Sequence, residues 1–156
     1  MHSRHLRPPR LNRIFDCYDP PLFFVTACTA ERKPVLASAT VQQAVESYAS
    51  RGLSLNCALG RYVLMPDHLH LFVQLPREIT LSRWMKGLKA TIGKALPISA
   101  PITRSIWQPG FFDHLIRQSG SYEEKWNYVR ENPVRALLVT HWKDWPWHGE
   151  PVRIAM

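Results

Sequence analysis

The sequence holds 156 residues, of which 20 are lysine or arginine and 12 are aspartate or glutamate, so the formal net charge is +8. A hydrophobic share of 46% and a charged share of 21% are typical of a globular chain and exclude a collagen-like or disordered one. The length suits one compact domain. With only 7 glycines, a glycine-rich nucleotide-binding loop is disfavoured.

Membrane insertion and export are not expected. The longest apolar run, residues 22–28, is far shorter than the roughly 20 residues of a membrane-spanning helix. The basic N-terminus is not followed by the apolar segment of a secretory signal. The odd number of cysteines (Cys17, Cys28 and Cys57), without a Cys-x-x-Cys pair, favours reduced thiols over disulfides or a thiolate zinc site. We therefore expect a cytoplasmic protein.

The chain begins with a basic arm over residues 1–15. Arg4, Arg7, Arg10 and Arg13 occur there without any acidic residue. Such an arm is either a solvated terminus or a segment that contacts nucleic-acid phosphates. We expect it to precede a core over 16–140 and a tryptophan-rich tail over 141–156.

A strand, a helix and a second strand are predicted next. The β-prone run 22–28 is followed by apolar residues at helical spacing over 40–50. Apolar and polar residues then alternate from 53, which predicts a strand over 53–64. The Met-Pro-Asp sequence at 65–67 marks a turn.

The strand after this turn carries two histidines. His68 and His70 are two residues apart, so their imidazoles project from the same face of the predicted strand. Two imidazoles aimed at one point can bind a divalent cation and leave positions open for a substrate oxygen. The alternative is a pair of exposed histidines on a half-solvated sheet. Asp67 is expected to serve the turn rather than the metal.

A basic helix is predicted over residues 80–96. At helical spacing, one face is apolar and consists of Leu81, Trp84, Met85, Leu88, Ile92 and Leu96. Arg83, Lys86 and Lys94 fall on the opposite face, with Lys89 at its edge. This positive face is either an ordinary solvated surface or a surface for a polyanion, and the scarcity of acids nearby favours the polyanion.

An extended stretch over 105–116 completes the order β-α-β-β-α-β. This order predicts an α+β fold, a ferredoxin-like antiparallel sheet with helices packed on it. Asp113 and His114 in this stretch either contribute to the site from a second layer or anchor the strand.

A further helix is predicted to begin with the capping box at Ser121 and to reach Asn132. Tyr128 and Asn132 are four residues apart, so on a continuous helix they share one face. A nucleophile and an oxygen ligand can occupy such a face. Alternatively, Tyr128 packs in the core and Asn132 caps the helix. The rival tyrosines are Tyr18, Tyr48, Tyr62 and Tyr122.

Three motifs occur in order: Met65-Pro-Asp-His-Leu-His-Leu-Phe72, Trp107-Gln-Pro-Gly-Phe-Phe-Asp-His-Leu-Ile-Arg117 and Tyr128-Val-Arg-Glu-Asn-Pro-Val-Arg-Ala136. Together they resemble the single-tyrosine transposases of the HUH endonuclease superfamily, most closely the REP-associated tyrosine transposases of bacteria. The resemblance runs from about Phe23 to Val139. One departure is Leu137, which stands where the family usually has glycine.

The resemblance implies that His68, His70 and Asn132 bind Mg²⁺ or Mn²⁺ and that Tyr128, on the late helix, is the nucleophile. The implied reaction nicks and transfers single-stranded DNA, such as a REP-type hairpin, through a 5′-phosphotyrosine, with the basic arm and helix contacting DNA. A bacterial, nucleoid-associated location follows, as a monomer or a homodimer. Two alternatives stay open: a hairpin-binding protein that has lost cleavage, and a metal-dependent hydrolase using the two histidines with or without His114.

Overall fold

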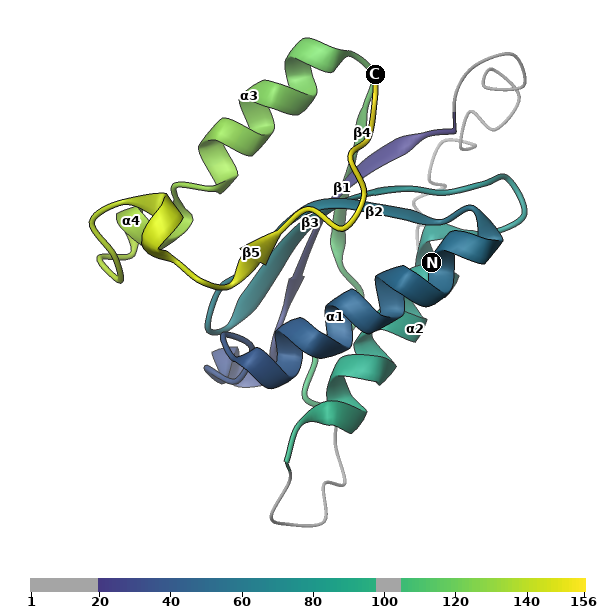
Figure 1. Cartoon of the computed structure of the whole chain (residues 1–156). Coiled ribbons are helices and arrows are strands. Elements are labelled where there is room, and N and C mark those ends of the chain that lie inside the picture. The colour runs from purple at the N-terminus through teal and green to yellow at the C-terminus, as the bar shows by residue number, and fades with distance from the viewer. Residues whose placement is uncertain (1–19, 98–104) are drawn as a thin grey trace, which may run out of the picture.

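The computed structural model describes residues 20–97 and 105–156, so the expected arm with Arg4, Arg7, Arg10 and Arg13 lies outside the described residues. Within them, one five-stranded antiparallel sheet has the order β4-β1-β3-β2-β5 (Figure 1). Its strands are β1 Leu22–Cys28, β2 Ala58–Leu64, β3 His68–Gln74, β4 Phe112–Ile116 and β5 His148–Gly149. The predicted antiparallel α+β fold is confirmed, and β5 is an unpredicted addition.

Helices cover both faces of the sheet. α1 (Ala39–Gly52) and α2 (Leu81–Ala95) pack together on one face, while α3 (Ser119–Val129) lies on the other and is followed by the short α4 (Asn132–Arg135) (Figure 1). The residues that α2 buries match the predicted apolar stripe and are Leu81, Trp84, Met85, Leu88 and Ile92. None of the described helices is long and apolar enough to cross a membrane.

The central strand β3 is covered from both sides. Leu69 and Leu71 belong to the core beneath α1 and α2. On the opposite face, Phe72 is fully buried and its ring lies 4.8 Å from the ring of Tyr122 in α3. Because α3 covers this part of the second face, the half-buried His68 and His70 lie at the end of β3 where that cover stops.

The start of the second strand differs from the prediction. Residues Leu53–Leu55 form a short 3-10 helix, and β2 begins only at Ala58. Asn56 has a φ of 60°, a left-handed conformation that asparagine tolerates well and that ends the helical segment. The alternation of apolar and polar residues at 53–57 resembles that of a half-buried strand. In the structure, however, Leu53 and Leu55 are exposed in this turn, so the alternation does not reflect a buried strand face.

The late helix is also divided differently from the prediction. α3 begins at Ser119 with Gln118 as its N-cap, so the predicted start at Ser121 is wrong. It ends at Val129, and Asn132 opens the separate helix α4. A proline lacks the N–H that a continuing helix needs but suits the first turn of a new one. Pro133 occupies that first turn, which accounts for the break.

The tryptophan-rich tail over 141–156 is part of the fold. Its strand β5 pairs with β2 at the edge of the sheet. The indole N–H of Trp145 donates a buried hydrogen bond of 2.9 Å to the carbonyl of Leu64. Ile154 is buried against the same cluster that holds α3. The tail therefore closes one edge of the sheet and fixes the end of β2 that leads into the histidine strand.

Candidate functional site

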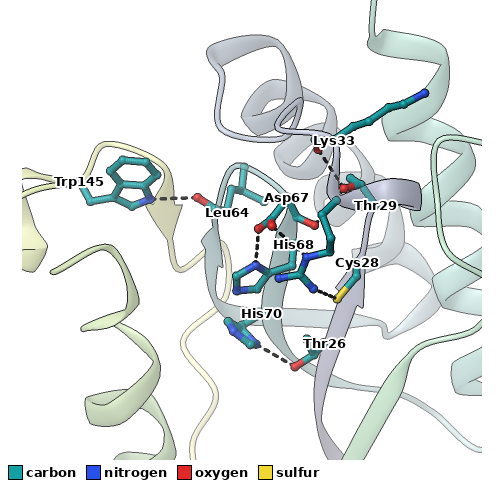
Figure 2. Close-up of polar contacts among 10 residues, drawn as sticks. Thr26, Cys28, Thr29, Lys33, Leu64, Asp67, His68, His70 and Trp145 are labelled. Carbon is teal, nitrogen blue, oxygen red and sulfur yellow. Dashed lines mark hydrogen bonds and ion pairs between the residues drawn. The ribbon is translucent and has the colours of Figure 1, made fainter. Parts of the chain in front are cut away.

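The turn before β3 is held by backbone contacts to the end of β1. Thr29 is fully buried, and its N–H donates to the carbonyl of Asp67 over 2.9 Å. Its hydroxyl also lies 2.9 Å from the carbonyl of Lys33 and 3.1 Å from that of Asp67. These contacts fix the backbone from which His68 projects (Figure 2).

The carboxylate of Asp67 orients the first histidine. Its Oδ1 lies 2.7 Å from Nδ1 of His68, and its Oδ2 accepts a 2.9 Å hydrogen bond from Nε of Arg32 (Figure 2). Burial alone would raise the pKa of Asp67, but the hydrogen bonds from His68 and Arg32 outweigh it and hold the pKa below its ordinary value. Asp67 is therefore ionised at neutral pH and does more than the turn chemistry expected of it: it holds His68 with Nε2 outward.

The second histidine is fixed from the neighbouring strand. Nδ1 of His70 lies 2.8 Å from the hydroxyl of Thr26, its cross-strand partner on β1 (Figure 2). Its ring stacks on Phe24 with 5.5 Å between the ring centroids. Burial, and then the electrostatic effects of His68, Lys125 and Arg135, lower the pKa of His70 to about 3. The imidazole is thus neutral at physiological pH, as a metal ligand must be.

The two imidazoles form a donor set that suits a divalent cation. Their ring centroids are 4.8 Å apart, and within the described residues no hydrogen bond occupies the Nε2 of either ring. In the same part of the chain, no three or more His, Cys, Asp and Glu side chains gather closely enough to hold a metal. Further ligands must therefore come from another residue type, such as the amide of Asn132, or from the substrate and water.

The loop that carries Arg32 is conformationally strained. Glu31 and Arg32 have φ angles of 55° and 54°. These angles lie in the left-handed region, which residues other than glycine adopt at an energetic cost. Arg32 nevertheless reaches Asp67, and its NH1 also donates to the sulfur of Cys28 over 3.0 Å. These contacts offset part of the strain and connect the loop to the histidine pair.

Tyr128 lies on the histidine side of the sheet, near the end of α3. Its side chain is 64% exposed. The guanidinium of Arg135 sits 4.0 Å from the centroid of its ring and donates to its backbone carbonyl over 2.8 Å. The same guanidinium donates to Oδ1 of Asn132 over 2.6 Å. Arg135 thus joins Tyr128 and Asn132 across the helix break, and no described hydrogen bond or ring contact joins Tyr128 to either imidazole.

The rival tyrosines are engaged elsewhere. Tyr18 lies outside the described residues. Tyr48 donates to the carbonyl of Trp84, Tyr62 donates to Glu46, and Tyr122 is buried. Burial raises the pKa of each of these three phenols, which disfavours the phenolate that a nucleophile needs. Tyr128 is the exposed tyrosine of the part of the chain that the structure describes.

The basic residues of α2 lie on the face of the sheet opposite the histidines. Arg83, Lys86 and Lys94 are exposed there. Lys89 is different, because its ammonium group donates to the carbonyl of Gln108 over 3.2 Å and to that of Gly110 over 2.5 Å. Burial lowers its pKa. Lys89 thus fastens the loop before β4, a role that charge patterning did not indicate.

The two candidates on β4 point to different faces. His114 pairs with Phe24 of β1, and Asp113 pairs with Val25. Since alternate residues of a strand share a face, His114 lies on the face of Phe24 and His70, whereas Asp113 points to the other. Both are exposed, and β1 separates both from the histidine strand.

The sequence of the chain matches a known protein family. A family model described as "Transposase IS200 like" matches residues 23–132, a span that includes both histidines, Tyr128 and Asn132. The chain belongs to the IS200-like transposase family. This membership confirms the resemblance that the three sequence motifs indicated.

Two curated relatives match the chain over part of their length. The REP-associated tyrosine transposase of Escherichia coli (strain K12) is 31% identical over 91 residues, which are 57% of this chain and 52% of that protein. A relative from Haemophilus influenzae (strain ATCC 51907 / DSM 11121 / KW20 / Rd) is 31% identical over 94 residues, 54% of this chain and 53% of that protein. The chain thus spans about half the length of the curated relatives it matches.

A solved structure has the same fold. A REP-associated tyrosine transposase bound to a REP hairpin superposes with a TM-score of 0.68 at 24% identity, covering 84% of this chain and 77% of that one. The residues that sequence reasoning missed, Thr26, Arg32 and Arg135, have no metal or nucleophile pattern of their own. The pairing of β1 with β3 brings Thr26 to His70, the loop after β1 brings Arg32 to Asp67, and α4 brings Arg135 to Tyr128 and Asn132.

Proposed function

We propose that the chain nicks single-stranded DNA and transfers the cut strand, with Tyr128 as the nucleophile. The observation that carries the proposal is the combination of an exposed tyrosine and two oriented imidazoles on one side of the sheet. Family membership supports the reaction class. The substrate proposed is single-stranded or hairpin DNA, since the structure with this fold is of a transposase bound to a REP hairpin.

The reaction is a transesterification. The Tyr128 oxygen forms a bond to phosphorus while the bond from phosphorus to the 3′ oxygen breaks. The phenol releases its proton to solvent and the departing 3′ oxygen takes one up, so the products are a 5′-phosphotyrosine and a 3′-hydroxyl. Because the phosphodiester is kept in the covalent link, a second 3′-hydroxyl can reverse the attack and join strands. Arg135 packs against the tyrosine ring and would place a positive charge beside the scissile phosphate.

His68 and His70 are proposed to hold Mg²⁺ or Mn²⁺, with Asn132 as the third ligand. When bound, the cation supplies Lewis-acid stabilisation of the charge that develops on the scissile phosphate. The residues fit it in two respects: each Nδ1 is engaged by a neighbour, which leaves both Nε2 atoms for a ligand, and His70 is neutral at physiological pH. The Asn132 oxygen has a second lone pair, so its bond to Arg135 does not prevent ligation.

Backbone contacts to DNA are proposed for the exposed basic residues of α2, Arg83, Lys86 and Lys94, and for the arm with Arg4, Arg7, Arg10 and Arg13. Because α2 and the histidines are on opposite faces, a DNA that touches both must pass around the edge of the sheet. Association with the bacterial nucleoid would follow from such binding.

The test is cleavage of a labelled hairpin oligonucleotide with single-stranded flanks, in Mg²⁺ or Mn²⁺, analysed on a denaturing gel. We expect cleavage to be lost in excess EDTA and in His70→Ala, and retained in His141→Ala, which alters an exposed histidine of the tail. Cleavage that is unchanged in EDTA or in His70→Ala would contradict the proposed metal centre. Tight hairpin binding without cleavage in either metal would favour a binding protein instead.

A further inference from the structure

A small cavity lies beside the histidine pair at the free edge of the sheet. It measures about 210 Å³ and is lined by Phe24, Thr26, Phe112, Asp113, His114 and Lys125. Thr26 is also the residue that holds Nδ1 of His70, so the cavity and the proposed metal centre share one side chain. Its other walls come from the edge strand β4 and from α3.

Phe112 lines this cavity and is 75% exposed, so a large apolar side chain is left open to solvent there. Through the sheet register, Phe112 pairs with Thr26, and Thr26 pairs with His70. All three side chains therefore lie on one face. With two strand spacings between them, the backbones of Phe112 and His70 are roughly 10 Å apart, a distance suited to a nucleotide beside the reacting phosphate.

Positive charge borders the cavity. The ammonium group of Lys125 lies 4.8 Å from the ring centroid of Phe24, within the cavity wall. The same Phe24 ring stacks on His70, so the ammonium group and the imidazole share one aromatic neighbour. An exposed aromatic ring next to a cation is the combination by which proteins bind unpaired bases: the ring stacks on the base and the cation meets the backbone. A purely apolar partner would also meet polar groups here, because Asp113, His114 and Lys125 line the cavity with the two phenylalanines.

We propose that the cavity holds one unpaired nucleobase of single-stranded DNA, stacked on Phe112, with Lys125 contacting the adjoining phosphate. The inference rests on the proposed function, because it places this base next to the nucleotide that Tyr128 attacks. It adds a base-stacking site at the edge strand β4 that none of the three sequence motifs identifies as such.

Binding of a fluorescent dT12 strand tests the proposal, in the Tyr128→Phe background so that no covalent step intervenes. Phe112→Ala is expected to raise the Kd roughly tenfold, within about 5- to 150-fold, as the loss of one stacked base does. The loss should be equal at every salt concentration, because stacking releases no counterions. Lys125→Gln should instead lower the slope of log Kd against log salt by about 0.7.

Three controls separate stacking from folding. Phe112→Trp should restore the affinity, and Leu55→Ala, which truncates an exposed apolar side chain away from the site, should not change it. Binding of a blunt duplex should be equally strong with and without Phe112. A dT12 strand carrying 4-thiothymidine, irradiated with the unaltered chain, should crosslink to the peptide that contains Phe112, which requires no variant to fold.

The inference is overturned if Phe112→Ala leaves dT12 binding unchanged or weakens duplex binding by the same factor. It is also overturned if Phe112→Ala converts a dimer of the chain into monomers and this change accounts for the loss of binding. It is also overturned if the crosslink maps elsewhere. Covalent adduct formation is measured separately on the chain that retains Tyr128. An adduct with normal dT12 binding in Phe112→Ala refutes only the base site, whereas Phe112-dependent binding without any adduct refutes only the proposed reaction.

Discussion

Asp67 lies between His68 and Arg32, and this contact decides which nitrogen of the histidine faces outward. The carboxylate accepts from both neighbours, so the Nδ1 of His68 is engaged and Nε2 is left for a ligand. Thr26 does the same for His70 from the adjacent strand. At the residue scale the site is therefore organised by side chains that would not themselves touch the metal.

Replacing Asp67 tests this arrangement. Asp67→Asn keeps an oxygen near His68 but removes the charge and turns an amide donor toward Arg32. We expect the affinity for Mn²⁺ to fall about 10- to 100-fold, as is usual when the partner of a metal-binding histidine is altered. Titration followed by the paramagnetic signal of free Mn²⁺ measures it. Asp144→Asn, at an exposed position of the tail, is the matched control, and an equal affinity in both variants would contradict the role of Asp67.

Residue types and spacing alone identified His68, His70 and Tyr128 as candidates, because a strand and a helix have fixed periods. Thr26 and Arg32 were beyond such reasoning. Thr26 meets His70 only through the register of β1 against β3, and Arg32 reaches Asp67 from a loop with left-handed backbone angles. Contacts between segments that are distant in sequence leave no local pattern to read.

At the scale of elements, the end of α4 has a backbone conformation that favours glycine at position 137. Leu137 has a φ of 60°. Its N–H donates to the carbonyl of Val134, and the N–H of Leu138 donates to that of Pro133. These two bonds form a Schellman motif, whose left-handed position is usually glycine. Here the position is held by a leucine that is 91% exposed, so little burial compensates for the backbone cost.

Leu137→Gly is therefore expected to stabilise the chain. Relief of the left-handed backbone outweighs the greater freedom of glycine in the unfolded state, for a gain of about 0.5–1 kcal/mol. This corresponds to a rise in Tm of roughly 1–4 °C for a domain of this size. Leu138→Gly, one residue later and without a positive φ, should lower the Tm instead. Thermal unfolding followed by circular dichroism decides, and a lower Tm for Leu137→Gly would refute the strain argument.

The tail makes a second prediction at this scale. Trp145→Phe keeps an aromatic ring but removes the N–H that bonds the buried carbonyl of Leu64. Leaving a buried carbonyl unpaired costs about 1–3 kcal/mol. Trp142→Phe is the control, because the indole N–H of Trp142 makes no hydrogen bond among the described residues. Urea denaturation should show a lower free energy of unfolding for Trp145→Phe only, and equal losses in the two variants would contradict the anchor.

Element boundaries were less predictable than the elements themselves. The alternation at 53–57 imitated a strand, and the spacing of Tyr128 and Asn132 assumed one continuous helix. The tail's two-residue strand β5 is too short to leave a period, and it is defined by its pairing with β2. The predicted order of strands and helices in the core was correct, because the spacing of apolar residues indicates the type of each element and the face that it buries.

At the scale of the whole molecule, the sheet separates two surfaces. One carries α3 with Tyr128, the histidine pair and the cavity at Phe112. The other carries α1 and the basic helix α2, opposite α3 (Figure 1). The net charge of +8 favours binding of polyanions in general. In the proposed reaction, the orientation of the site rather than the net charge would determine which phosphate of the DNA meets Tyr128.

In the proposed reaction, Tyr128 becomes covalently linked to a 5′ phosphate. The most direct measurement is mass spectrometry of the chain after reaction with hairpin DNA and Mn²⁺, followed by nuclease and protease digestion. We expect a nucleotide adduct on the peptide that contains Tyr128, and no adduct in Tyr128→Phe. Cleaved DNA without any peptide adduct, or an adduct on another tyrosine, would contradict it.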